Sequence, residues 1–152
     1  MIANNAAGTY GQIGWLKLPA ERLNFSESNT SGGGFQQRLM SPNSVGSSPA
    51  YKVTYGSGTF QYFINGLLVD SDSAPSFGGC VSQNYAEIQN LANQMAGGYN
   101  NHELFTSAQV RRSDTGSWSY MNGTPTTTDP FLFSYSVVSS TQIEVWDNAC
   151  AS

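Results

Sequence analysis

The stretch "YKVTYGSGTFQYFINGLLVDSD", residues 51–72, contains segments in which apolar and polar residues alternate. Such alternation is typical of β-strands, because successive side chains of a strand point to opposite faces. A "GSG" tripeptide ends the first segment, and Asn65-Gly66 separates the second from the third. Asn-Gly favours a type I′ turn, in which both central residues have positive φ. The stretch therefore predicts consecutive antiparallel strands, with Asn65-Gly66 at the tip of a two-residue hairpin. One face of the first strand is formed by Tyr51, Val53 and Tyr55.

Segments with the same period of two fill most of the remaining chain. The stretch "SESNTSGGG", residues 26–34, is of low complexity and is expected to be a loop. Residues 88–96 offer a helical alternative, a short helix or turn after a strand. This pattern predicts an all-β sandwich or barrel, and a curved sandwich with an aromatic, polar-lined concave face fits it best. The other expected strands span residues 10–18, 35–40, 80–89, 104–112, 131–138 and 142–146.

The composition is that of a weakly charged, turn-rich β protein. With 152 residues we expect a single domain over 1–152, in which 1–9 form a disordered or edge tail. Charged residues make up 11% of the chain, against about 25% in a typical domain. A composition of this kind is common among secreted domains. Three N-glycosylation sequons also fit an extracellular protein, at Asn24, Asn29 and Asn122.

Charge and hydropathy argue against two classes of partner. A net charge of −4, with few basic residues, argues against nucleic-acid binding, which needs clustered Lys and Arg. No apolar run approaches the roughly 18 residues that a membrane-spanning helix needs. The start "MIANNAAGTY" lacks the basic and apolar regions of a signal peptide, so Met1 is expected to be the edge of an excised domain, although a cytosolic protein would begin in the same way.

The two cysteines, Cys80 and Cys150, are expected to form one disulfide. Such a bond would close a long loop and stabilise the fold by roughly 4 kcal/mol in the chain-entropy model. It would also hold the C-terminal tail beside the start of a strand. The alternative is two buried thiols.

Most catalytic chemistries lack their residues in this chain. His102 is the sole histidine and there is no cysteine cluster, so we expect neither a metal nor another cofactor. The "DSD" of residues 70–72 could touch calcium, but a solvated hairpin end is the preferred interpretation. No G-x-S-x-G motif marks a serine nucleophile, and the disulfide prediction competes with cysteine catalysis.

The carboxylates remain, and Glu87 differs from the others. Alternation places it on one face with Gln83, Tyr85 and Gln89. If this face is partly shielded from water, the pKa of Glu87 is raised above its usual value. The alternative is a solvent-facing glutamate on an outer sheet. Glu103 is expected at a strand edge, and Glu144 is expected to be exposed on the face of Gln142 and Trp146. The carboxylates expected to be solvated in turns are Glu21, Glu27, Asp114, Asp129 and Asp147.

The segments "YGQIGW" (10–15), followed by Pro19, and "YAEIQN" (85–90) together resemble the two halves of the glutamic peptidase (eqolisin) signature. The later stretch "AEIQNLANQMAGG" also resembles the C-terminal part of neprosin-type glutamic peptidases. The resemblance implies a lectin-like (concanavalin-like) antiparallel β-sandwich and cleavage of polypeptides in acid. It implies that Glu87 is the general base and that Gln12 orients the water and donates to the oxyanion. Gln94, in the segment after the glutamate, joins the expected binding residues.

The chain departs from these families in three respects. It has fewer residues before Gln12 than the eqolisins, and Ile88 stands where a tryptophan usually follows the glutamate. The neprosin type also has a second glutamate where this chain has Gln12. These departures leave open an inactive relative or a fragment of a larger protein.

Two non-catalytic functions compete with the peptidase. One is an extracellular carbohydrate-binding module, in which aromatic rings of a concave sheet stack on sugars. The other is a structural subunit of an extracellular assembly, which would self-associate through edge strands. A polypeptide or an extracellular polysaccharide is thus the expected partner. The aromatic residues expected at the binding face are Tyr10, Trp15, Tyr51, Tyr55, Tyr62 and Tyr85.

Overall fold

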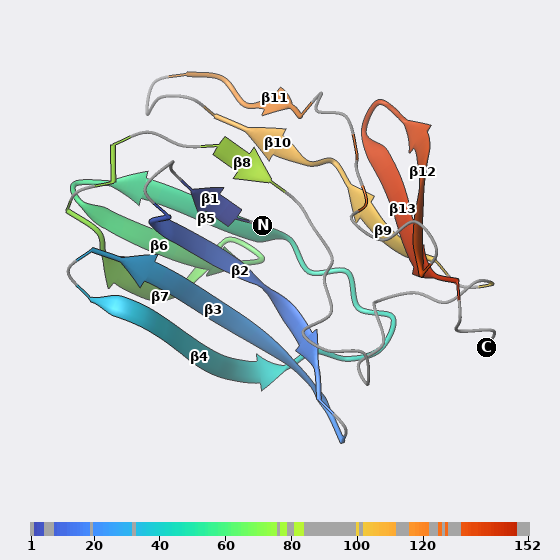
Figure 1. The fold of residues 1–152 in the computed structure, drawn as a ribbon, viewed down its shortest axis with the longest axis horizontal. Helices are drawn as coiled ribbons and strands as arrows, with labels where there is room; N and C mark the ends of the chain where they lie inside the picture. Colours follow the sequence, from blue (N-terminus) through green and yellow to red (C-terminus); the bar gives the residue numbers. More distant parts are fainter. Residues whose placement is uncertain are drawn as a thin grey trace. The chain divides into compact units, whose positions relative to one another are not determined.

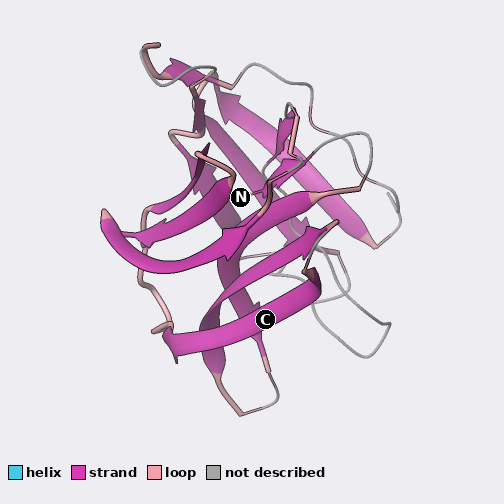
Figure 2. Ribbon diagram, turned by 90° about the vertical axis from the view of Figure 1, so that its left-hand side faces the viewer, coloured by secondary structure: helices cyan, strands magenta, loops and turns pink. Residues whose placement is uncertain are grey.

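The computed structural model is built from β-strands (Figure 2). The residues that it describes contain no helix, so the all-β prediction is confirmed. The chain divides into two compact units, Met1–Gln83 and Asn84–Ser152. The described residues are 2–4, 8–18, 20–31, 33–75, 77–78, 81–83, 100, 102–111, 116–121, 125, 127 and 132–148. The predicted helical segment near 88–96 lies outside them. Among described residues, no helix has the length and apolar character needed to cross a membrane.

The first unit contains an antiparallel sheet of five strands in the order β4-β3-β2-β1-β8 (Figure 1). Residues 1–9 are expected to form a tail, but the structure places Ile2–Asn4 within this sheet, paired on both sides. The predicted loop over 26–34 is wrong, since one strand continues to Thr30 and the next begins at Gly34. The strands are β1 (Ile2–Asn4), β2 (Tyr10–Lys17), β3 (Arg22–Thr30), β4 (Gly34–Pro42) and β8 (Val81–Gln83).

The second sheet of this unit is the predicted meander. It consists of β5 (Tyr51–Gly56), β6 (Thr59–Ile64) and β7 (Leu67–Ser73), in that order. The two-residue hairpin at Asn65-Gly66 is confirmed, because both residues have positive φ (51° and 82°). The side chain of Asn65 also fixes the turn to the start of β5, because its Oδ1 accepts a hydrogen bond from the Ala50 amide at 2.9 Å.

Aromatic side chains form the core between these two sheets. Phe60 and Tyr62 are fully buried, and Ile13 of β2 packs with them. Gly11 makes room for this packing, because a Cβ at that position would lie 2.8 Å from the Phe60 ring and from Tyr62 Oη. The remaining buried members of the core are Ala74 and Phe77. The first unit is therefore a β-sandwich with a small aromatic core.

The second unit contains a three-stranded antiparallel sheet and a short ribbon. The sheet has the order β12-β13-β9, formed by Phe133–Ser139, Gln142–Asp147 and Glu103–Thr106. The strand predicted over 104–112 is interrupted at Ser107, which has φ 54°. The chain resumes as β10 (Gln109–Val110), which pairs with β11 (Ser119–Tyr120).

Candidate functional site

The structure describes only one of the two residues of the predicted Gln12–Glu87 dyad. Gln12 lies on β2, whereas Glu87 is outside the described residues, so their predicted proximity stays a prediction. The same holds for the predicted Cys80–Cys150 disulfide. The other predicted residues outside the described part of the chain are Tyr85, Gln94, Asp114, Asn122 and Asp129.

Among the described residues, the carboxylate that Gln12 contacts is that of Glu27. Gln12, Glu27 and Gln37 occupy one row across β2, β3 and β4, as direct cross-strand partners. Glu27 Oε1 accepts hydrogen bonds from Gln12 Nε2 at 2.9 Å and from the Tyr10 hydroxyl at 2.7 Å. Its other oxygen, Oε2, accepts one from Gln37 Nε2 at 2.7 Å. We call Tyr10, Gln12, Glu27 and Gln37 the Glu27 site.

The Glu27 site holds a buried carboxylate among neutral donors. Glu27 is 8% exposed and Gln12 is 5% exposed. The three donors around the carboxylate are two amides and a phenol, and no described cation forms an ion pair with it. A carboxylate has about four acceptor positions, so these donors use about three of them. A carboxyl group can serve as a general acid or base, and an amide N–H can donate to an oxyanion.

The prediction that Glu27 is solvated in a turn is therefore wrong. The polar run of residues 26–30 continues a strand because its side chains have partners on both sheet faces. Ser26 and Ser28 are buried on the face opposite to Glu27. The signal in the sequence was the amide at Gln12 and at Gln37, but only the strand register shows that both lie beside Glu27.

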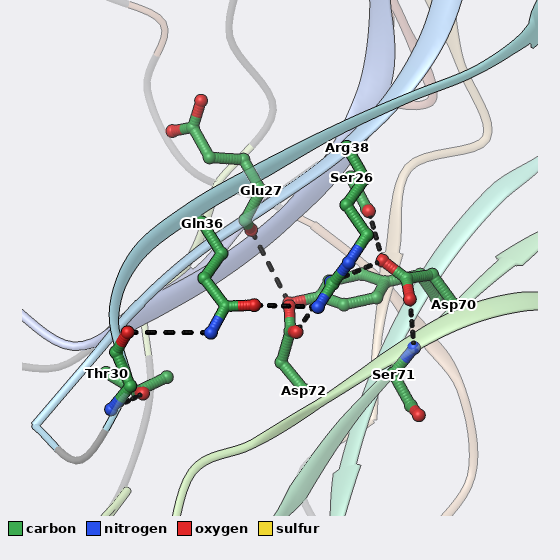
Figure 3. Close-up of polar contacts among 10 residues, drawn as sticks. Ser26, Glu27, Thr30, Gln36, Arg38, Asp70, Ser71 and Asp72 are labelled. Atoms are coloured by element: carbon green, nitrogen blue, oxygen red, sulfur yellow. Dashed lines mark hydrogen bonds and ion pairs between the residues drawn. The ribbon is translucent and has the colours of Figure 1, made fainter.

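Arg38 lies on the face of β4 opposite to the Glu27 site (Figure 3). Its ion pairs join β4, at the edge of the five-stranded sheet, to β7, at the edge of the three-stranded sheet. Its Nη1 lies 2.8 Å from Asp70 Oδ2 and 2.6 Å from Asp72 Oδ1. The Ser26 hydroxyl donates to Asp70, and Arg38 Nη2 donates to Gln36 Oε1 at 2.7 Å. In Figure 3 the Glu27 side chain points away from these residues. We call the Arg38, Asp70 and Asp72 contacts the Arg38 clamp.

The Arg38 clamp corrects the interpretation of "DSD" as a solvated hairpin end. Asp72 is 6% exposed and lies within β7. Two carboxylates can lie two residues apart on one strand face here because a guanidinium with several donors binds both. Among the described residues no group of three or more acidic, histidine or cysteine side chains is arranged to hold a metal ion.

Several of the aromatic residues expected to bind a ligand have partners within the described part of the protein. Tyr62 is fully buried, so it does not present its ring at a surface. Tyr51 donates its hydroxyl proton to Asn24 Oδ1 at 2.6 Å, and the Arg22 guanidinium lies 3.8 Å from the centre of the Trp15 ring. The sequon residue Asn24 is itself 5% exposed.

Tyr62 gives the sandwich a pH-sensitive group. Its hydroxyl donates to Asp72 Oδ2 at 3.1 Å. Burial raises the pKa of Tyr62 far above its usual value, and the negative charge of Asp72 raises it further.

We expect this shift to weaken the fold in alkali. The unfolded chain releases the Tyr62 proton above about pH 10, whereas the folded chain retains it. The contribution of Tyr62 is therefore complete below pH 10 and falls as pH rises from 10, by up to about 1.4 kcal/mol per pH unit. Denaturant unfolding of wild type and Tyr62→Phe from pH 8 to 11 measures the difference. Parallel stability curves for the two proteins above pH 10 would contradict the expectation.

The second unit carries a separate cluster on its sheet. His102 Nδ1 lies 3.0 Å from Glu144 Oε2, and both side chains are 28% exposed. The imidazole also stacks on Trp146, with ring centres 4.0 Å apart and planes 10° apart. Glu144 is thus half-buried and paired, where the sequence suggested an exposed position. Asp147, expected in a solvated turn, is a buried residue of β13.

Comparisons of the chain with protein-family models, curated proteins and solved structures gave no match.

Proposed function

We propose that this protein is an acid-acting hydrolase of the glutamic type, with polypeptides as substrates and Glu27 as its acid–base residue. The observation that carries the proposal is the 2.9 Å hydrogen bond between Gln12 and the buried carboxylate of Glu27. The resemblance to glutamic peptidases supplies the reaction class, with Gln12 in the position of its glutamine. That resemblance implies Glu87 as the base, so the proposal moves this role to Glu27.

In the proposed reaction Glu27 takes a proton from a water molecule whose oxygen attacks the carbonyl carbon of the peptide bond. An N–H of Gln12 donates to the oxyanion of the tetrahedral intermediate. The carbon–nitrogen bond then breaks as Glu27 returns its proton to the leaving nitrogen, and the second product is a carboxylic acid. Tyr10 and Gln37 hold the carboxylate in one orientation through their hydrogen bonds of 2.7 Å.

The surroundings of Glu27 are suited to this cycle. One residue serves first as base and then as acid, so it works best at a pH where both protonation states are accessible. Neutral donors can remain in place around either form, because amides and phenols also offer acceptor oxygens. The weakly charged, acidic composition is consistent with activity in acid.

A carbohydrate-binding module is the second candidate, and the β10–β11 ribbon favours it. Trp118 is 44% exposed and Tyr120 is 53% exposed, and the Arg111 guanidinium lies 5.4 Å from the centre of the Trp118 ring. Exposed aromatic rings of this kind stack on the apolar faces of sugars. These are not the aromatic residues that the sequence suggested for the role.

Incubation with acid-denatured serum albumin at pH 3–4, followed by mass spectrometry of the products, tests the proposed function. We expect wild type to cleave and Glu27→Gln to lose at least about 100-fold in rate, the typical lower bound for a general acid–base group. Glu21→Gln is the matched control, because Glu21 is exposed, and should cleave like wild type.

Two outcomes distinguish a wrong assignment of Glu27 from a wrong reaction class. Activity that survives Glu27→Gln but is lost in Glu87→Gln would overturn the assignment of Glu27. Absence of cleavage by the wild type would overturn the hydrolase, and binding of polysaccharides that is lost in Trp118→Ala would then favour the second candidate.

A further inference from the structure

Strand β4 has the properties of an interface. It is nine residues long, lies at the end of the five-stranded sheet and pairs, among described residues, only with β3. Phe35 and Leu39 project from the same face and are 63% and 51% exposed. A long edge strand with exposed apolar side chains is a template for pairing with another strand.

The charge that would oppose such pairing is already compensated. Edge strands of monomeric proteins commonly carry charged residues, and β4 has one, Arg38. Both carboxylates of the Arg38 clamp bind its guanidinium. An incoming strand therefore meets no uncompensated charge within β4. Pro42 is the other residue of β4 that discourages pairing, and it lies at the last position of the strand.

We propose that β4 pairs with β4 of a second copy of this chain, in an antiparallel arrangement with its two-fold axis at Gln37. The sequence Phe35-Gln36-Gln37-Arg38-Leu39 is complementary to itself in this register. Phe35 then lies opposite the Leu39 of the other copy, twice, and each Gln36 lies opposite an Arg38. A two-fold axis makes both copies use the same surface, so the exposed Phe35 and Leu39 of each copy are covered by those of the other. The five-stranded sheets of the two copies thereby join into one.

Sedimentation velocity over a range of protein concentrations tests the dimer. We expect the wild type to change from monomer to dimer as concentration rises. Phe35→Lys should raise the dimer dissociation constant at least tenfold. Val45→Lys is the matched control, because Val45 is 85% exposed and lies outside the strands, and it should dimerise like wild type. A wild type that is monomeric throughout, or a dimer that Phe35→Lys leaves unchanged, would overturn the proposal. Unchanged circular dichroism would show that each variant is folded.

Cysteine crosslinking tests the register. Residues directly opposite each other on paired strands have Cβ atoms roughly 5 Å apart, close to the separation in a disulfide. A mixture of Phe35→Cys and Leu39→Cys proteins should therefore form a heterodimeric disulfide on oxidation. Either variant alone should not, because two copies of the same position lie roughly 13 Å apart along the strands in this register. Wild type measures any crosslinking through the natural cysteines. Crosslinking of Phe35→Cys with itself, or none in the mixture, would overturn the register.

Discussion

Replacing Arg38 with methionine is expected to lower the free energy of unfolding by about 2 kcal/mol at neutral pH, between the cost of losing an exposed ion pair and that of breaking a buried one. The guanidinium is the cation between Asp70 and Asp72, at 2.8 and 2.6 Å. Its removal leaves two carboxylates close together, and the Asp72 side chain is only 5% exposed. The cost stays below that of a fully buried pair because the Arg38 side chain is itself 43% exposed, so solvent screens part of the interaction.

Urea unfolding monitored by tryptophan fluorescence measures this loss. Lys17→Met is the matched control, since Lys17 is an exposed cation of the same sheet, and it should change stability by less than about 0.5 kcal/mol. The loss in Arg38→Met should shrink in acid, where protonation removes the repulsion between the two carboxyl groups. A loss below 0.5 kcal/mol at neutral pH, comparable to that of the control, would show that the clamp does not hold the edge strands together.

Replacing Phe60 with alanine is expected to cost about 3–5 kcal/mol, the usual range for removing a buried aromatic ring. Phe60 is fully buried, and its ring centre lies 4.7 Å from that of Phe77 and 5.4 Å from that of Tyr55. The core of the first unit is small, so the remaining side chains cannot fill the space that this ring leaves. A loss of this size approaches the total stability of many domains.

Thermal and urea unfolding measure this second loss. Phe35→Ala removes the same ring from an exposed position and, at protein concentrations too low for association, should cost less than about 0.5 kcal/mol. Equal losses in the two variants would contradict the location of the core between the two sheets.

Local signals made most of the strands predictable. The hairpin at Asn65-Gly66 follows from two residues whose backbone tolerates positive φ. The alternation of residues 59–64 places Phe60 and Tyr62 on one face of the strand and Gln61 on the other, but Tyr62 was expected at a binding face and is buried. Strand β3 was missed because Ser, Asn and Glu occupy both of its faces, so the alternation is not visible as hydrophobicity. Its polar residues are stable in a strand because neighbouring strands supply their hydrogen-bond partners.

The site was harder to predict than the fold, because it depends on contacts between distant residues. Gln12 was predicted as a site residue from its motif, but its contact with Glu27 is set by the register of β2 against β3. The Arg38 clamp joins residues 32 and 34 positions apart, and His102 meets Glu144 across 42 positions. Such pairs follow from topology and leave no local pattern in one sequence.

The central claim is that Gln12 and Glu27 act as one catalytic unit, and a double-mutant cycle on kcat/KM at pH 3–4 tests it most directly. The cycle compares wild type, Gln12→Ala, Glu27→Gln and the double variant. Residues that act as a unit are strongly non-additive, so we predict that the double variant is no slower than Glu27→Gln alone. Rate losses of the two single variants that multiply in the double variant, or single variants as fast as wild type, would contradict the claim.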